Sequence, residues 1–306
     1  MDNVTDTDVP TGQGFAKSLK LDCTATASLA TSGSRIQLYQ AIEGQNLQYL
    51  KKGTSNASSL TVSFWVKSTK TGTFNYELYD NDNARHSVNQ FTINSSNTWE
   101  KKSLTYSGDT SGAFNNDNNL SLYLLLFLGA ENSLTSGTTP SGWSSITTAN
   151  RGVGQVNIGD NTANNFWITG VQLEAGTTAS DFEFLPYDVN LQRCQRYYYK
   201  ITDVPGGDAN GYFATGYLYN SNRLYFWIPL GIQMRTSPTL ESAAGTDYYI
   251  FYRDGTNDNF NTILATEMTN RGCMLRSDDT HISGTAGQAG GIHSSSNSKV
   301  AFSSEL

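Results

Sequence analysis

The chain has 306 residues, and its 20 Lys plus Arg against 27 Asp plus Glu give a formal net charge of −7. This balance argues against a nucleic-acid-binding surface, because affinity for phosphates comes largely from clustered Lys and Arg. Charged residues make up only 15% of the chain while aromatic residues reach 12%. Long amphipathic helices depend on the Glu, Lys and Arg that are scarce here, so the composition predicts an all-β chain with polar loops.

Three cysteines, Cys23, Cys194 and Cys273, are odd in number and far apart in sequence, so they predict neither a disulfide framework nor a zinc site. The N-terminus, residues 1–6, is acidic where a secretory signal needs positive charge followed by an apolar run. We therefore expect folding in a reducing cytoplasm. The most apolar stretch, residues 120–128, is too short for a membrane-spanning helix of about 20 residues, so no membrane insertion is expected.

Alternating apolar and polar residues dominate the chain between residues 60 and 173. The pattern is clearest over 60–66 and recurs at 74–78, 91–93 and 104–106, each time bounded by Gly, Asn, Asp or Ser. Period-two segments separated by turn residues are typical of antiparallel strands. Their spacing favours a β-sandwich over βαβ units.

The strand expected over residues 120–128 is apolar on both faces, because Tyr123, Leu125 and Phe127 stand opposite a row of leucines. A sandwich strand that faces water should be polar on its outer side. The pattern predicts that a second domain or a neighbouring subunit covers this face. Residues 135–165 show no period and are expected to form a long surface excursion.

A short helix is expected after residue 186, where Asp188 can act as the cap and Leu191, Cys194 and Tyr198 lie along one side. Tyr-rich strands follow. The expected organisation is a sandwich over residues 1–185, a joint with a short helix over 186–200 and a smaller distal β domain over 201–306.

No motif of an enzyme is present. The histidines His86, His281 and His293 stand in polar, loop-like or strand-edge contexts and are expected at the solvated surface. Glu174 and Glu183 are candidates for a carboxylate pair, but their place beside the domain joint favours hydrogen bonding to backbone. We therefore expect a chain without enzymatic activity.

Oxygen-rich loops at residues 80–83 and 115–118, and the pair Asp254 and Asp258, carry ligand types that calcium prefers. None fits the EF-hand pattern, and Asn and Asp are also the preferred turn residues. Plain turns are expected, with no metal and no cofactor.

Loop aromatics give the strongest binding signal, because sugars stack on flat rings while nearby polar groups bond their hydroxyls. Trp143 lies in a polar loop where no alternation gives it a buried partner. Tyr249 and Tyr252 flank the expected turn at Asp254, with Arg253 beside them. These four residues, Trp143, Tyr249, Tyr252 and Arg253, are the predicted ligand-binding set. The alternative for each ring is packing onto its own domain or into a subunit interface, which is the commoner state of such rings.

Several segments resemble bacteriophage tail-fibre and other virion fibre proteins. A junction between domains is similar over Ile168-Thr169-Gly170-Val171-Gln172-Leu173-Glu174-Ala175-Gly176, Asp181-Phe182-Glu183 and Leu191-Gln192-Arg193-Cys194-Gln195-Arg196-Tyr197-Tyr198. Residues 42–47 and 60–68 look like the carbohydrate-binding-module-like jelly roll that precedes this junction. Residues 229–230, 234–235, 238–239 and 304–306 resemble the distal domain that follows it.

The resemblance implies a jelly-roll sandwich followed by a distal β domain, a homotrimer, a place in the virion after synthesis in the host cytoplasm, and contacts with other virion proteins. It also implies recognition of a host-surface glycan. The acidic net charge favours neutral sugars or proteins over teichoic-acid phosphates and other polyanions. The alternatives are a polysaccharide-degrading fibre whose carboxylate pair forms only in the trimer, a soluble carbohydrate-binding module of the host, and a purely architectural decoration of capsid or tail.

Overall fold

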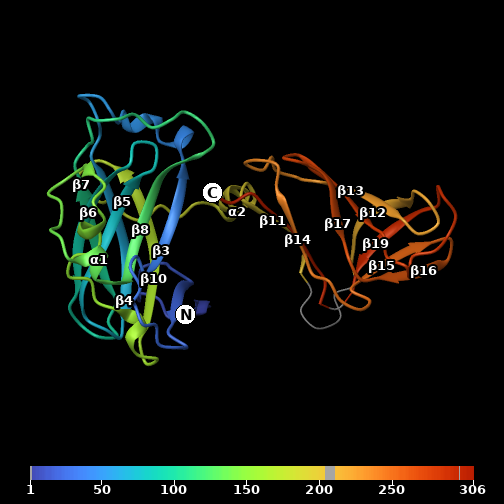
Figure 1. Cartoon of the computed structure of the whole chain (residues 1–306), viewed down its shortest axis with the longest axis horizontal. Coiled ribbons are helices and arrows are strands. Elements are labelled where there is room, and N and C mark those ends of the chain that lie inside the picture. The colour runs from blue at the N-terminus through green and yellow to red at the C-terminus, as the bar shows by residue number, and fades with distance from the viewer. Residues whose placement is uncertain (1, 204–210, 296) are drawn as a thin grey trace. The chain divides into compact units, whose positions relative to one another are not determined.

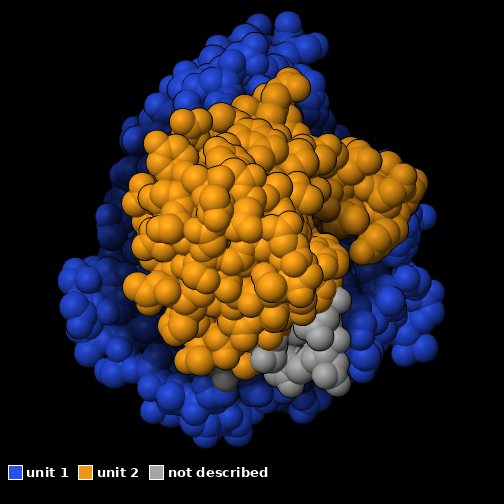
Figure 2. All heavy atoms as spheres, turned by 90° about the vertical axis from the view of Figure 1, so that its right-hand side faces the viewer, with its two compact units in different colours: residues 1–184, 306 blue, residues 185–305 orange. Residues whose placement is uncertain are grey.

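The structure is a computed structural model that describes residues 2–203, 211–295 and 297–306. It divides into two compact units, residues 1–184 with 306 and residues 185–305, which Figure 2 distinguishes by colour. Within the described residues, every strand pair is antiparallel. The predicted all-β class is therefore confirmed.

The first unit is a sandwich of two five-stranded sheets (Figure 1). Its strands are β1 Asp2–Asp6, β2 Ser18–Asp22, β3 Arg35–Glu43, β4 Leu60–Ser68, β5 Gly72–Asp80, β6 Arg85–Ile93, β7 Glu100–Tyr106, β8 Leu120–Ala130, β9 Ser144–Ser145 and β10 Asn165–Ala175. One sheet has the order β1-β2-β10-β4-β7 and the other the order β3-β8-β5-β6-β9. The two interleaved sets β2-β10-β4-β7 and β3-β8-β5-β6 make this sandwich a jelly roll.

Short helices connect these strands. They are η1 Gly44–Asn46, η2 Gln48–Leu50, α1 Asn132–Thr135, η3 Thr148–Asn150 and η4 Ile158–Asp160.

The core of this unit lies between the two sheets and follows the alternation of the sequence. In β4, Val62, Phe64 and Val66 are fully buried, and the ring of Phe64 meets Phe91 of β6 edge-on at 5.1 Å between centroids. Facing apolar side chains from two twisted sheets interdigitate in this way in β-sandwiches.

The outer face of β8 is covered by the chain itself. Phe127 has 0% exposure and the guanidinium of Arg151 lies 5.9 Å from its ring centroid. Asn75 of the neighbouring strand β5 donates to the carbonyl of Val153 at 3.1 Å, and Leu134 is buried. Residues 135–165 are mostly irregular and mostly exposed or half-buried, so the predicted surface excursion is confirmed. The prediction that another domain or subunit covers the outer face of β8 is wrong. Residues 131–157, here called the covering segment, bury it instead.

The second unit combines a seven-stranded sheet with a three-stranded sheet (Figure 1). Its elements are α2 Tyr187–Gln195, β11 Tyr198–Asp203, β12 Tyr212–Leu218, β13 Leu224–Pro229, β14 Thr239–Ser242, β15 Tyr249–Arg253, β16 Thr256–Phe260, β17 Leu264–Thr269, β18 Gly272–Ser277, β19 Ala289–Ser294 and β20 Lys299–Ser303. The sheet orders are β16-β15-β19-β12-β13-β18-β17 and β11-β20-β14. One hydrophobic core, with Phe226, Phe251 and Phe302 among its residues, joins the two sheets.

The expected short helix is present as α2, but Asp188 does not cap it. Pro186 occupies the N-cap position and Asp188 lies in the first turn. Proline is tolerated at the start of a helix because the backbone N–H that it lacks would have no partner within the helix there. Tyr198 lies outside the helix in β11, which pairs with β20. Both α2 and β11 therefore belong to the second unit, whose boundary lies between residues 184 and 185. Of the described helices, none has the length and apolar character that a membrane crossing requires.

Candidate functional site

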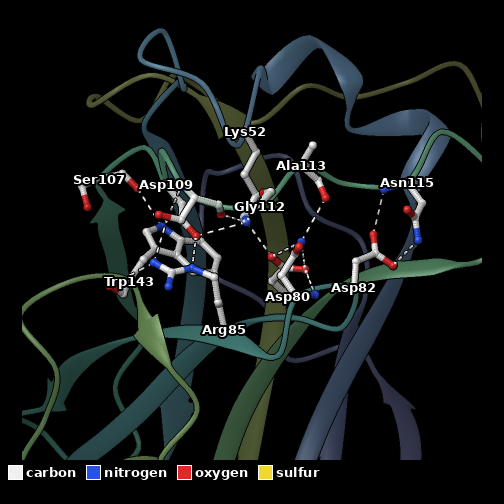
Figure 3. Close-up of polar contacts among 12 residues, drawn as sticks. Lys52, Asp80, Asp82, Arg85, Ser107, Asp109, Gly112, Ala113, Asn115 and Trp143 are labelled. Atoms are coloured by element: carbon white, nitrogen blue, oxygen red, sulfur yellow. Dashed lines mark hydrogen bonds and ion pairs between the residues drawn. The ribbon is translucent and has the colours of Figure 1, made fainter.

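Trp143, the first of the predicted ligand-binding residues, is held in place by the first unit (Figure 3). Its indole Nε1 donates to the carbonyl of Ser107 at 2.8 Å, and its ring packs against the hydrophobic core. The Nη2 of Arg85 donates to the carbonyl of Trp143 at 3.4 Å. The expectation that Trp143 lacks a buried partner is therefore wrong, because a loop without alternation can still fold back onto the sandwich.

Beside Trp143 lies a buried ionic cluster built around Lys52, whose side chain is 5% exposed. The Nζ of Lys52 lies 2.5 Å from Oδ2 of Asp80 and 3.1 Å from Oδ2 of Asp109. It also donates to the carbonyls of Ser111 and Gly112 at 2.9 and 2.7 Å (Figure 3). Four oxygens thus surround one ammonium group, which supplies the positive charge that a calcium ion would supply in such a set of oxygens.

The oxygen-rich loops next to this cluster are closed turns. The Oδ1 of Asp80 accepts from the backbone N–H of Asn83 at 3.1 Å, and Asp82 accepts from the N–H and the side-chain amide of Asn115 at 2.9 and 3.0 Å. Within residues 2–203, 211–295 and 297–306, no group of three or more His, Cys, Asp and Glu side chains is arranged to hold a metal ion.

The carboxylate of Asp109 makes folding depend on pH. Burial opposes its ionisation, but hydrogen bonds from Arg85, from the N–H of Ser111 and from Lys52 outweigh burial and hold the pKa of Asp109 below its usual value. Because the native pKa lies below the unfolded pKa of about 4, this stabilisation is present above pH ~4 and is lost as the pH falls through the native pKa.

We therefore expect the Tm of the first unit to fall between pH ~6 and pH ~3, and to fall less in Asp109→Asn than in the parent. Thermal unfolding followed by circular dichroism measures both. An equal fall in the two proteins would show that Asp109 contributes nothing to the acid sensitivity.

Two further predicted ligand-binding residues are not available to a ligand. Tyr249 is buried in the core of the second unit, its hydroxyl lies 2.8 Å from the carbonyls of Ala243 and Lys299, and burial raises its pKa to about 12. Arg253 is buried with its Nη1 2.8 Å from Oδ2 of Asp258. Both residues point into the unit because they share the inner face of β15.

Tyr252 points the other way and is exposed. The predicted turn at Asp254 is confirmed as the connection of the β15–β16 hairpin, with positive φ of 46° at Asp254 and 75° at Gly255. Such a pair of positive φ angles suits the right-handed twist of a two-residue hairpin.

Tyr252 belongs to an aromatic face on the outer side of the seven-stranded sheet. The register of the paired strands puts its members on one side of the sheet. They are Tyr212, Tyr217, Tyr225, Trp227, Tyr252 and His293. Tyr212 lies edge-on to His293 at 4.6 Å, directly over Gly291, where a Cβ would approach the tyrosine ring to 2.3 Å. A glycine is required there because only hydrogen fits beneath the ring.

A second aromatic surface lies on the outer face of the β3-β8-β5 sheet of the first unit. It is a cleft of about 270 Å³, here called the tyrosine cleft, lined by Arg35, Gln37, Tyr39, Tyr79, Tyr123, Leu125, Ile146 and Arg151. Its floor is the sheet, while Ile146 and Arg151 belong to the covering segment. A concave site lined by rings and a few polar groups is the usual form of a small-ligand pocket.

The three tyrosines of the cleft come from adjacent strands. Tyr79 pairs directly with Tyr123 across β5 and β8, with ring centroids 6.2 Å apart and nearly parallel planes. Tyr39 of β3 meets Tyr123 edge-on at 5.7 Å and is 61% exposed. Burial, and then the neighbouring hydroxyls of Tyr39 and Tyr79, raise the pKa of Tyr123. Like any tyrosine hydroxyl at neutral pH, it keeps its proton and can donate or accept a hydrogen bond.

A buried carboxylate fixes the far wall of the cleft. Glu77 of β5 is fully buried and accepts from Nε and Nη2 of Arg151 at 3.0 and 2.8 Å. Its Oε1 also lies 2.8 Å from Nδ1 of His86. His86 is fully buried, so its predicted place at the solvated surface is wrong, because the covering segment lies over the strand that carries it.

The remaining predicted residues fall elsewhere. Glu174 accepts from the backbone N–H of Ser180 at 2.9 Å, which confirms its expected role of hydrogen bonding to backbone. His281 is exposed and lies 2.6 Å from Oδ1 of Asp279. The tyrosine cleft was not predicted from the sequence. The signal for it was the strand that is apolar on both faces, in which Tyr123 and Leu125 lie on the outer face.

No family model matches the chain, and no curated protein matches it. Among solved structures, the enzymatically active domain of tailspike protein 4 from bacteriophage CBA120 is 16% identical with a TM-score of 0.32, over 57% of this chain and 18% of that chain. A Penaeus vannamei nodavirus structure is 12% identical with a TM-score of 0.19, over 92% of this chain and 97% of that chain. The chain thus spans under a fifth of the tailspike structure, and at these TM-scores neither likeness carries an argument.

Proposed function

We propose that this chain is a virion structural protein of fibre type that binds a host-surface glycan and has no enzymatic activity. The resemblance of its domain junction, residues 168–198, to fibre proteins supports the virion role. The tyrosine cleft is the observation that carries the glycan role, because it combines exposed rings with hydrogen-bond donors on a rigid sheet. Trp143 and Tyr249, by contrast, are occupied by contacts within their own units.

The expected strength of one such site is modest. A single stacking contact between a ring and another flat group contributes about 1 kcal/mol, so two or three rings in one cleft correspond to a Kd in the roughly millimolar range. Linked copies raise the apparent affinity by about 10²- to 10⁴-fold without any new contact. Weak single sites are therefore compatible with firm adsorption by an oligomer.

We further propose that three copies of the chain assemble. The aromatic face of the second unit favours an assembly, since Tyr212, Tyr217 and Trp227 are 66%, 44% and 43% exposed on one side of one sheet. Contiguous exposed aromatic surface of this kind marks interaction sites in soluble proteins. Light scattering is expected to report three times the mass of the chain, and a stable monomer at micromolar concentration would refute the assembly.

The glycan role is tested by truncating cleft rings. We expect Tyr39→Ala and Tyr123→Ala each to weaken binding to an array of bacterial surface polysaccharides about fivefold per site, since each removes one stacking contact. The matched control is Tyr49→Ala, which removes a tyrosine that is 56% exposed on η2 outside the cleft, and its binding should equal that of the parent.

Two outcomes of the same assay favour other functions. Release of reducing ends from a bound polysaccharide would favour the polysaccharide-degrading fibre. No binding by the parent protein to any polysaccharide or host cell would favour a purely architectural role.

A further inference from the structure

The polar groups of the tyrosine cleft include several hydrogen-bond donors but no carboxylate. Its lining side chains include two arginines and one glutamine, but neither Asp nor Glu. The nearby carboxylate of Glu77 is fully buried and taken up by Arg151 and His86. The tyrosine hydroxyls and the guanidinium of Arg35 can donate to an anionic group, and no lining side chain carries a negative charge that would repel it.

One positive charge of the cleft is uncompensated. Arg151 is neutralised by Glu77, whereas Arg35 is exposed and, among the described residues, has no carboxylate within ion-pair distance. Its Nε donates to Oε1 of Gln37 at 2.7 Å and its Nη1 to the carbonyl of Gly33 at 3.3 Å. These contacts orient the guanidinium along β3 but leave its positive charge without a counter-charge.

From these two observations we infer that the tyrosine cleft selects a glycan residue that bears a carboxylate, such as a uronic acid. The carboxylate accepts from Arg35, whose planar guanidinium matches it in a bidentate pair. The apolar face of the sugar ring stacks on Tyr39 or Tyr123. This inference rests on the proposed glycan role. It assigns the cleft a preference for an acidic sugar, whereas the net charge of −7 favours neutral sugars. Charge at the site outweighs charge spread over the surface, because solvent and salt screen distant charges.

The experiment compares an oligogalacturonate with its methyl ester, which has the same ring and linkages but no charge. Calorimetry or NMR titration of the full chain is expected to show at least tenfold tighter binding of the acid, and the difference should shrink as salt is raised. Arg35→Gln is expected to abolish this preference. Lys51→Gln, which removes the same charge at an exposed position outside the cleft lining, should keep it.

A second variant tests the uncompensated charge of Arg35. Gln37→Glu places a carboxylate where Oε1 of Gln37 now accepts from Nε of Arg35, so it neutralises the guanidinium and should weaken binding of the acid more than binding of the ester. Equal binding of acid and ester by the parent, with both weakened by Tyr39→Ala, would overturn the carboxylate preference and leave the glycan role standing. A poly(glycerol phosphate) that binds as tightly as the acid would also overturn it, in favour of anions in general. If Tyr39→Ala changes no glycan binding at all, the proposed function itself fails.

Discussion

Replacing Lys52 by methionine is expected to lower the free energy of unfolding of the first unit by about 3–5 kcal/mol. The substitution keeps an unbranched apolar stem of similar length but leaves the carboxylates of Asp80 and Asp109 facing each other without their shared cation. Asp80 has 0% exposure, so water cannot replace the ammonium group without opening the loops between β5 and β6 and between β7 and β8. Denaturant unfolding measures the loss, read from the transition that the substitution shifts.

The control is a lysine that pairs near the surface. Lys20 lies 3.2 Å from Asp22 with both side chains partly exposed, and Lys20→Met should cost less than about 1 kcal/mol. A triple variant, Lys52→Met with Asp80→Asn and Asp109→Asn, should recover part of the stability because it removes the uncompensated charges. A Lys52→Met protein as stable as the Lys20→Met protein would contradict the ionic role of Lys52.

The sequence predicted the sandwich well because its determinants are local. In β4 the alternation of Val62, Phe64 and Val66 with mostly polar residues places these three side chains on the face that packs into the hydrophobic core. The ionic cluster could not be predicted in this way. Lys52 and Asp109 stand in two separate loops and Asp80 ends β5, so the three residues meet only once the jelly-roll connections bring these segments to one end of the sandwich.

The candidate site was predicted in part for a related reason. In β15, Tyr252 is exposed and Tyr249 is buried. Side chains alternate between the two faces of a strand, so the positions of these two residues in the sequence are enough to place their rings on opposite faces. The tyrosine cleft, in contrast, needs the order β3-β8-β5, which a single sequence does not reveal. The covering segment shows no alternation of apolar and polar residues in its sequence. Hydrogen bonds such as that from Asn75 to Val153 hold it on the sheet, and a repeating row of apolar side chains is not needed.

The second large effect is expected at the outer face of β8. Phe127→Asp should prevent stable folding of the first unit, because it removes a ring with 0% exposure and buries a carboxylate beneath the covering segment. Loss of the ring alone costs about 3–5 kcal/mol, and the buried charge adds several more, against a typical domain stability of about 5–15 kcal/mol. Arg151 cannot fully neutralise the new carboxylate, since its Nε and Nη2 already bind Glu77.

The measurement separates folding from assembly. Circular dichroism and light scattering of Phe127→Asp are expected to show partial loss of the β spectrum together with aggregation, because the second unit has its own core. Tyr39→Asp places the same charge on the same sheet face at a residue that is 61% exposed, and it should fold like the parent while losing affinity for an acidic glycan. If Phe127→Asp instead yields a folded chain of lower assembled mass, Phe127 faces a neighbouring subunit, and the covering segment is not what buries the outer face of β8.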